Sequence, residues 1–162
     1  MAKEIKLRKD VCENDKWDLS SLYPCDEAWE NDFKKLQKKV DEASLFKGTL
    51  GKSPENLLAA AKWDTDVTLL FEQLANYAFL KYAAEANNTE NQRMTGMISQ
   101  LETQLSTATA YYVPEILSIP NIDKWLEKKD FDDYRVSFKK MLRKREHTLS
   151  QSEEAILARQ GE

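Results

Sequence analysis

The sequence is poor in the residues that tight turns and disulfide frameworks require. It contains four glycines, four prolines and two cysteines in 162 residues. So few glycines and prolines argue against a β-sandwich or barrel, in which many short strands are joined by tight turns. The two cysteines, Cys12 and Cys25, are too few for a disulfide framework, although one bridge between them is geometrically open. We therefore do not expect a small, cross-linked secreted protein.

The sequence also lacks long hydrophobic runs and a strong excess of positive charge. No stretch approaches the ~18 uncharged apolar residues that are needed to span a bilayer. The N-terminus, MAKEIKLRKD, has no apolar core and does not resemble a secretory signal. A net charge of −4 gives no general attraction to nucleic acid or to anionic membranes. We expect a cytoplasmic protein with neither a nucleic-acid partner nor a membrane partner.

Apolar residues recur at helical spacing in the sequence, which is 41% hydrophobic and 32% charged. From Asp26 to about Phe46 they step by four, three, four and three residues, which places them on one face of a helix. Asp26 is the predicted N-cap of this helix, and Gly48 is its predicted left-handed end. The apolar face consists of Trp29, Phe33, Leu36, Val40 and Ala43.

A second helical region is predicted from Ser53 to about residue 86. The run Ser53-Pro54-Glu55 combines a capping hydroxyl, a proline at the first helical position and an acid in the first turn. Polar residues near residue 64 leave two alternatives open, one long kinked helix or two helices that meet there. The later half is apolar around a wide arc, which is typical of a helix with neighbours on two sides.

A regular apolar seam predicts a further helix over residues 90–112, capped by Thr89 with Gln92 three residues later. The short link to the preceding helix predicts that the two helices are antiparallel neighbours. Gly96 lies within this helix and is expected to permit close packing against another helix. The seam consists of Met94, Ile98, Leu101, Leu105, Ala108 and Tyr112.

Shorter helical segments follow the seam. They are predicted around residues 115–119, around 122–126 and over Asp130–Arg145, and a last helix begins at the capping box Ser150–Glu153. The predicted fold class is therefore all-α, an antiparallel multi-helix bundle of about six or seven helices. An extended N-terminal arm, residues 1–25, precedes the bundle.

The end of this arm carries four large apolar residues without helical or strand spacing: Trp17, Leu19, Leu22 and Tyr23. Pro24 restricts the preceding residue and favours an extended conformation for it. We therefore expect the arm to lie across a surface and to insert these side chains. If Trp17 is fully buried, its replacement by alanine should destabilise the domain by about 3 kcal/mol.

The residues that would carry chemistry are few. A zinc site needs at least three converging ligands, and the sequence has a single histidine, His147, and no H-E-x-x-H motif. His147 lies at a predicted junction between helices, where a structural role is expected. Neither a glycine-rich phosphate loop nor a nucleophile elbow is present. The sequence therefore assigns no catalytic residue, no cofactor-binding residue and no metal ligand.

The run WDLSSLYP, followed by the helix start DEAWE within Lys16–Glu30, resembles the N-terminal region of the oligoendopeptidase F family. These proteins are zinc-dependent peptidases of the thimet-oligopeptidase type. The resemblance continues at Phe46-Lys47-Gly48, at Pro114-Glu115-Ile116-Leu117 and at His147-Thr148-Leu149-Ser150. It covers nearly the whole chain, although Cys12 and Cys25 stand where such sequences often have proline and serine.

The resemblance implies that residues 26–162 form a helical N-terminal lobe and that the catalytic zinc domain is absent from this chain. In the full-length parent, zinc held by H-E-x-x-H and a downstream glutamate would hydrolyse short peptides. The lobe would shape the substrate channel without being catalytic, and its partners would be the C-terminal catalytic domain and an oligopeptide. This chain alone is expected to bind no zinc and to cleave nothing.

A second hypothesis is a stand-alone helical module for protein interaction. The hairpin of residues 64–112 and the aromatic arm would then present a groove for a partner helix. The reading frame after Glu162 discriminates between the two hypotheses, because continuation into an H-E-x-x-H helix supports the peptidase. An exposed apolar patch, through which the isolated chain would self-associate, is expected where the missing domain would pack.

Overall fold

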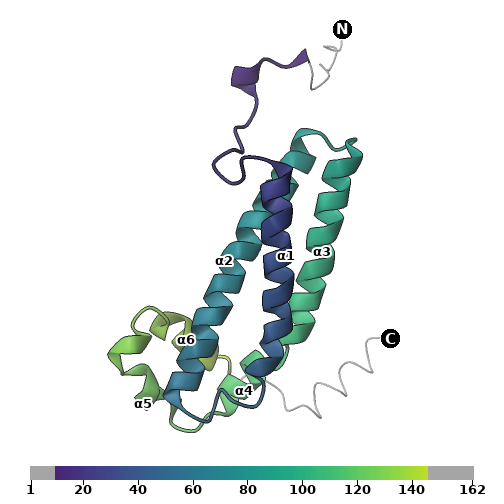
Figure 1. Cartoon of the computed structure of the whole chain (residues 1–162). Helices are drawn as coiled ribbons and strands as arrows, with labels where there is room; N and C mark the ends of the chain where they lie inside the picture. Colours follow the sequence, from purple (N-terminus) through teal and green to yellow (C-terminus); the bar gives the residue numbers. More distant parts are fainter. Residues whose placement is uncertain (1–9, 146–162) are drawn as a thin grey trace, which may run out of the picture. The chain divides into compact units, whose positions relative to one another are not determined.

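A computed structural model describes residues 10–145 of the chain, and every regular element in that range is a helix (Figure 1). This confirms the all-α fold class, with six α-helices in the described part of the chain. The first nine residues, His147 and the capping box at Ser150 lie outside it. The elements are η2 (Glu13–Asp15), α1 (Asp26–Glu42), η3 (Ala43–Leu45), α2 (Pro54–Ala84), α3 (Thr89–Thr109), α4 (Tyr112–Ser118), α5 (Ile122–Leu126), η4 (Lys129–Phe131) and α6 (Arg135–Leu142).

The described residues divide into two compact units. The first contains residues 10–46 and 62–110 and is called the three-helix unit, because it holds α1, most of α2 and α3. The second contains residues 47–61 and 111–145 and is called the short-helix unit. None of the helices described is long and apolar enough to cross a membrane.

The three-helix unit is built on the predicted apolar face of α1. All five residues of that face are buried, which confirms the helical spacing. Trp29 is fully buried, its ring stacks on Phe33 with centroids 5.2 Å apart, and its indole Nε1 donates a hydrogen bond to the Leu74 carbonyl at 2.9 Å. Trp29 therefore joins α1 to α2 through both packing and a satisfied polar group.

The helix α2 is a single element, so the alternative of two separate helices is wrong. Its predicted start is confirmed, because the Ser53 hydroxyl oxygen accepts a hydrogen bond from the Asn56 amide at 3.2 Å. Within the three-helix unit, α2 contributes to the core through a set of buried residues: Trp63, Val67, Leu74, Tyr77 and Ala78.

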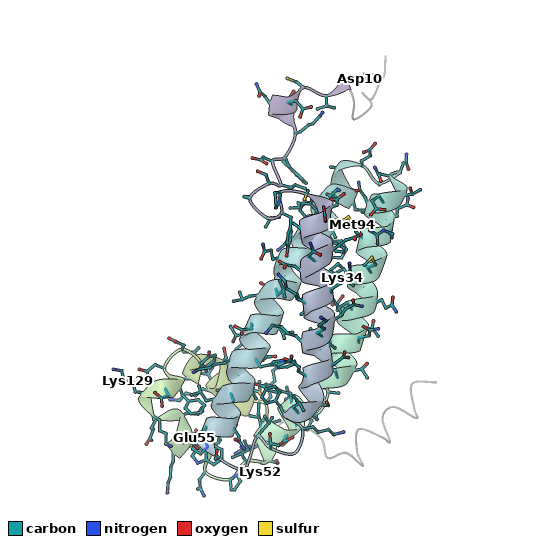
Figure 2. All side chains as sticks on the ribbon, in the orientation of Figure 1. Asp10, Lys34, Lys52, Glu55, Met94 and Lys129 are labelled. Carbon is teal, nitrogen blue, oxygen red and sulfur yellow. The ribbon has the colours of Figure 1, made fainter. Side chains whose placement is uncertain are left out.

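The helix α3 runs antiparallel to α2 after the short link 85–88, as predicted (Figure 1). Three residues of its seam are fully or almost fully buried, and Leu105 and Ala108 pack against the same core. One of the three is Met94, which is labelled in Figure 2. Tyr112, the last residue of the predicted seam, lies outside α3, because it begins α4. Gly96 is exposed, and a Cβ atom there would meet nothing within 4 Å, so the expected close packing is wrong.

Two predicted caps are displaced by one residue. Asp26 is the first residue of α1, and Cys25 occupies the N-cap position without a capping side-chain bond. At the start of α3 the cap is Asn88, whose side-chain oxygen accepts from the amides of Glu90 and Asn91 at 2.9 and 3.3 Å. Asn88 replaces Thr89 because its side chain reaches the first free amides of the helix, which are the groups that a cap must satisfy.

The arm is only partly docked. Tyr23 is 4% exposed, and Leu19 and Leu22 pack against the core of the three-helix unit. Trp17 is 62% exposed, so its predicted insertion is wrong. The physical reason is a turn in which the amides of Leu22 and Tyr23 donate to the Leu19 carbonyl. Trp17 precedes that turn, so the turn does not direct its side chain to the core.

The short-helix unit packs α4, α5 and α6 with the first residues of α2. The helix predicted over Asp130–Arg145 is shorter than expected, since η4 and a turn precede α6. The rings of Phe131 in η4 and Phe138 in α6 pack edge to face, with their centroids 6.1 Å apart. The buried residues of this unit include Leu50, Leu57, Ile116, Ile119, Ile122, Leu126, Phe131 and Phe138.

Candidate functional site

Two of the motifs that carry the family resemblance meet in the short-helix unit. The Glu115 carboxylate accepts hydrogen bonds from the backbone amides of Gly48 and Leu50, at 2.8 and 2.7 Å. Gly48 has a φ of 74°, a left-handed conformation that glycine adopts without steric cost. One charged side chain therefore holds the loop before α2 from a position 67 residues away in sequence. The sequence marks both motifs but does not reveal this contact between them.

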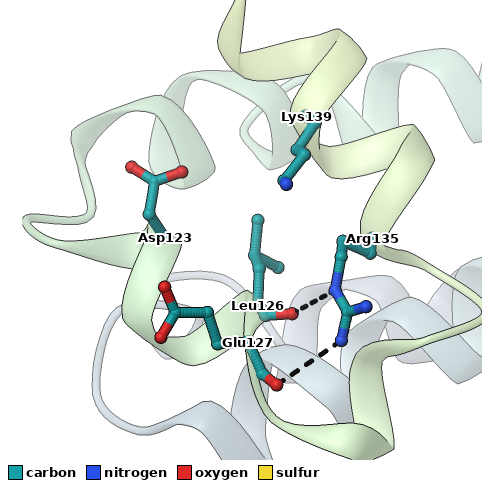
Figure 3. Close-up of a pocket in the computed structure, with 5 residues that line it drawn as sticks. All are labelled: Asp123, Leu126, Glu127, Arg135 and Lys139. Atoms are coloured by element: carbon teal, nitrogen blue, oxygen red, sulfur yellow. Dashed lines mark hydrogen bonds between the residues drawn. The ribbon is translucent and has the colours of Figure 1, made fainter.

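A charged hollow of about 260 Å³ lies between α5 and α6 (Figure 3). Asp123 and Glu127 stand across from Arg135 and Lys139, and Leu126 lies between them. Because the four charges balance, the hollow has no net charge with which to select an anion or a cation. It can accept a small group that carries both signs.

Arg135 in this hollow is already engaged with the backbone. Its Nε donates to the Leu126 carbonyl at 2.6 Å, and one terminal nitrogen lies 3.5 Å from the Glu127 carbonyl (Figure 3). The same nitrogen pairs with Asp132 at 2.5 Å. A cation at the carbonyl end of a helix satisfies free acceptors and the helix dipole. Arg135 therefore caps the C-terminal end of α5. This structural role explains the position of Arg135, and no bound ligand is needed to explain it.

A second polar cluster surrounds Asp26 at the start of α1. Lys81 lies 2.5 and 2.6 Å from the two carboxylate oxygens, and the Tyr77 hydroxyl donates to Asp26 at 2.9 Å. Burial raises the pKa of Asp26, but the hydrogen bonds from Lys81 and Tyr77 and the nearby cations outweigh it and lower the pKa below its usual value. Burial and Asp26 together raise the pKa of Tyr77. The cluster joins α1 to α2 and keeps Asp26 ionised.

Beside this cluster, a hollow of about 240 Å³ is bounded by the exposed Trp17. Its polar lining is mostly engaged with the protein. Lys81 pairs with Asp26, and the Asn91 amide donates to the carbonyls of Lys81 and Glu85 at 3.0 and 3.2 Å. The hollow therefore offers an indole and a partly buried ion pair, but no constellation of an acid, a base and a nucleophile.

The remaining predicted residues do not gather into a centre. Cys12 and Cys25 are exposed free thiols, so the bridge left open by the sequence does not form. Within residues 10–145, no three His, Cys, Asp or Glu side chains lie where they could jointly hold a metal ion. The described residues therefore offer no site for the zinc that the family resemblance implies for the catalytic domain of the full-length parent. That the chain carries no catalytic or metal-binding residue stays a prediction.

Comparison with known proteins agrees with the motifs. The family model described as Oligopeptidase F matches residues 115–162. Oligopeptidase PepF of Bacillus subtilis is 33% identical over 165 residues, which cover 99% of this chain and 24% of that protein. An oligoendopeptidase F homolog of Borreliella burgdorferi is 30% identical over 163 residues, covering 93% of this chain and 26% of the relative.

Solved structures show the same fold. A candidate peptidase from Chlamydophila abortus superposes with a TM-score of 0.85 at 24% identity and covers 96% of this chain and 27% of its own. Oligoendopeptidase F from Enterococcus faecium gives a TM-score of 0.71 at 26% identity and covers 82% of this chain and 26% of its own. The chain thus spans about a quarter of the length of these relatives. It belongs to the oligoendopeptidase F family and matches the N-terminal part of its members.

Proposed function

We propose that the chain forms the N-terminal helical lobe of an oligoendopeptidase, a zinc peptidase that hydrolyses short peptides. The observation that carries this proposal is the extent of the match, because 99% of the chain aligns with a quarter of an oligopeptidase. In this proposal the lobe narrows the approach to the catalytic domain, so that short unstructured peptides enter and folded proteins do not. Its work is steric and positional, and the parent protein is expected in the cytoplasm.

The polar clusters of the described residues suit a structural lobe better than a catalytic centre. The polar clusters around Asp26, Glu115 and Arg135 bond to the protein's own backbone and side chains. Charges that bond within the protein in this way hold its elements in place, although solvent screens the pairs that are partly exposed. A stiff helical lobe suits a protein that sets the width of a channel. The zinc chemistry is expected of the catalytic domain that such relatives carry.

The experiment uses a fusion in which this chain replaces the matching N-terminal quarter of Bacillus subtilis PepF. The fusion should hydrolyse a short quenched-fluorescence peptide, and it should leave the same sequence uncut when that sequence is displayed on a folded protein. The chain alone, supplied with zinc and repurified, should show no turnover. Turnover that scales with the chain alone contradicts the proposal, as does cleavage of the folded protein at the rate of the free peptide.

A further inference from the structure

The side of α2 that faces away from the core of the three-helix unit carries little charge. Five exposed residues follow one another in steps of three and four, so they form one stripe along the helix. Only one of them, Glu72, is charged. We call this set the outer stripe of α2, and it consists of Leu69, Glu72, Asn76, Phe79 and Ala83.

Two members of the outer stripe are large apolar side chains held in solvent. Leu69 is 61% exposed and Phe79 is 46% exposed, and Tyr82 beside the stripe is 41% exposed. Single exposed apolar residues are ordinary, but several on one helix face mark an interaction surface. These exposed residues also explain the wide apolar arc that the sequence shows in α2. One side of the arc is buried in the core, and the other side, which includes Leu69 and Phe79, is exposed.

The helix α1 provides an internal comparison in the same unit. Its exposed stripe has the same spacing and length, yet four of its five residues are charged. A charged stripe is expensive to remove from water, whereas Leu69 and Phe79 gain when they are covered. The exposed stripe of α1 is therefore more stable in water, whereas the outer stripe of α2 gains free energy when another apolar surface covers it. The exposed stripe of α1 consists of Glu27, Asn31, Lys34, Lys38 and Asp41.

The neighbouring helix α3 is charge-poor as well. From Met94 to Thr109 its single charged residue is Glu102. The hydroxyls of Thr103 and Thr107, both exposed, donate to carbonyls one turn earlier in α3, at 3.1 and 2.8 Å. Because these polar groups are already satisfied within the helix, covering them leaves no donor without a partner.

We propose that the outer stripe of α2 is the surface on which the C-terminal part of an oligoendopeptidase packs. The inference rests on the proposed function and adds the contact surface to it. The occupant follows from length, since the relatives continue for about three times the length of this chain beyond the region that it matches. A partner of that size can cover the outer stripe, in which two large apolar side chains accompany a single charge, while α1 remains in water.

The test compares thiol labelling in the chain alone and in the PepF fusion. In a Cys12→Ser, Cys25→Ser background, a cysteine replaces Leu69 or Phe79 on the outer stripe, or Asn31 on α1 as the matched control. All three positions are exposed, and none belongs to the hydrophobic core of the three-helix unit. Peptide mass spectrometry reads the labelling rate at each site. The rates of Leu69→Cys and Phe79→Cys should fall about tenfold or more in the fusion, and that of Asn31→Cys should change by less than about twofold.

Equal rates at Phe79→Cys in the chain and in the fusion overturn the proposal. An equal slowing of Asn31→Cys also overturns it, because the protection would then not be specific to α2. Slowing in the chain alone that grows with its own concentration assigns the stripe to a second copy and also contradicts the proposal. Peptide hydrolysis is measured on the same samples. Hydrolysis with unprotected stripe thiols leaves the proposed function standing and removes only this inference, whereas protection without hydrolysis supports the surface and counts against the function.

Discussion

The two units of the chain are stabilised in different ways. In the three-helix unit, long helices repeat apolar residues every three or four positions and bury them against one another. In the short-helix unit, α4, α5 and α6 have seven, five and eight residues. Helices that short bury little surface each, so charged side chains such as Glu115 and Arg135 hold loops and helix ends in place. The short-helix unit therefore combines its apolar core with charged side chains that bond to the backbone of loops and helix ends.

The largest effect is predicted in the three-helix unit, where Trp29→Ala should lower the free energy of unfolding by about 4 kcal/mol. Trp29 is fully buried and donates a hydrogen bond to the Leu74 carbonyl, so the substitution leaves a cavity and removes a bond between α1 and α2. Urea titration measures the change, with the exposed Asn31→Ala on the same helix as the control. A loss below about 1 kcal/mol would show that the seam of α1 does not dominate this unit.

In the short-helix unit, Glu115→Gln should cost about 2 kcal/mol, because glutamine keeps one acceptor oxygen and places a donor NH2 group against one of the Gly48 and Leu50 amides. Hydrogen exchange should show faster exchange of those two amides, while the core amides of α1 keep their protection. The control is Glu127→Gln, which removes a charge from the hollow between α5 and α6. If both variants lose equal stability, the loop is not held by Glu115 in particular.

The cluster at Asp26 predicts a smaller and pH-dependent effect. Its pKa is lowered in the folded chain, so it contributes stability above its unfolded pKa of about 3.9, and this is lost as the pH falls through the folded pKa. Because the Asp26 side chain is 40% exposed, solvent screening limits the contribution to about 1 kcal/mol or less. Asp26→Asn should therefore be less stable than the unsubstituted chain at neutral pH, and the difference should shrink in acid. Parallel urea titrations measure it, and a difference that grows in acid would contradict the assignment.

The smallest effect is predicted for Trp17→Ala. The indole is 62% exposed, so the loss should stay within about 0.5 kcal/mol, well under the value expected for a buried tryptophan. The melting temperature of this variant should match that of the unsubstituted chain, while Tyr23→Ala in the buried part of the arm lowers it. A large loss at Trp17 would show that the arm docks along its whole length.

The regular part of the fold could be predicted from the sequence, and the reason is physical. The apolar faces of α1 and α3 repeat over several turns, so the helical spacing is seen many times. Short runs such as WDLSSLYP likewise predict membership of the oligoendopeptidase F family, and the comparisons with known proteins support this prediction. Gly48 in its left-handed conformation was predicted from the residue type alone.

The rest depends on contacts between distant residues or on a choice between neighbours. Asn88 and Thr89 are both good capping residues, and only the structure shows which of them reaches the free amides. The bond between Glu115 and the Gly48 amide joins residues far apart in sequence. The size and apolar character of Trp17 predict that it inserts into a surface, but the turn after it directs only the later residues of the arm inward.

The most direct test of the account is the rate at which the PepF fusion hydrolyses a short quenched-fluorescence peptide, beside the chain alone under the same zinc concentration. The account predicts turnover by the fusion that a chelator abolishes, and none by the chain alone after repurification. Turnover by the chain alone, or a folded fusion that cuts no peptide, would contradict the assignment of these residues as the non-catalytic lobe of an oligoendopeptidase.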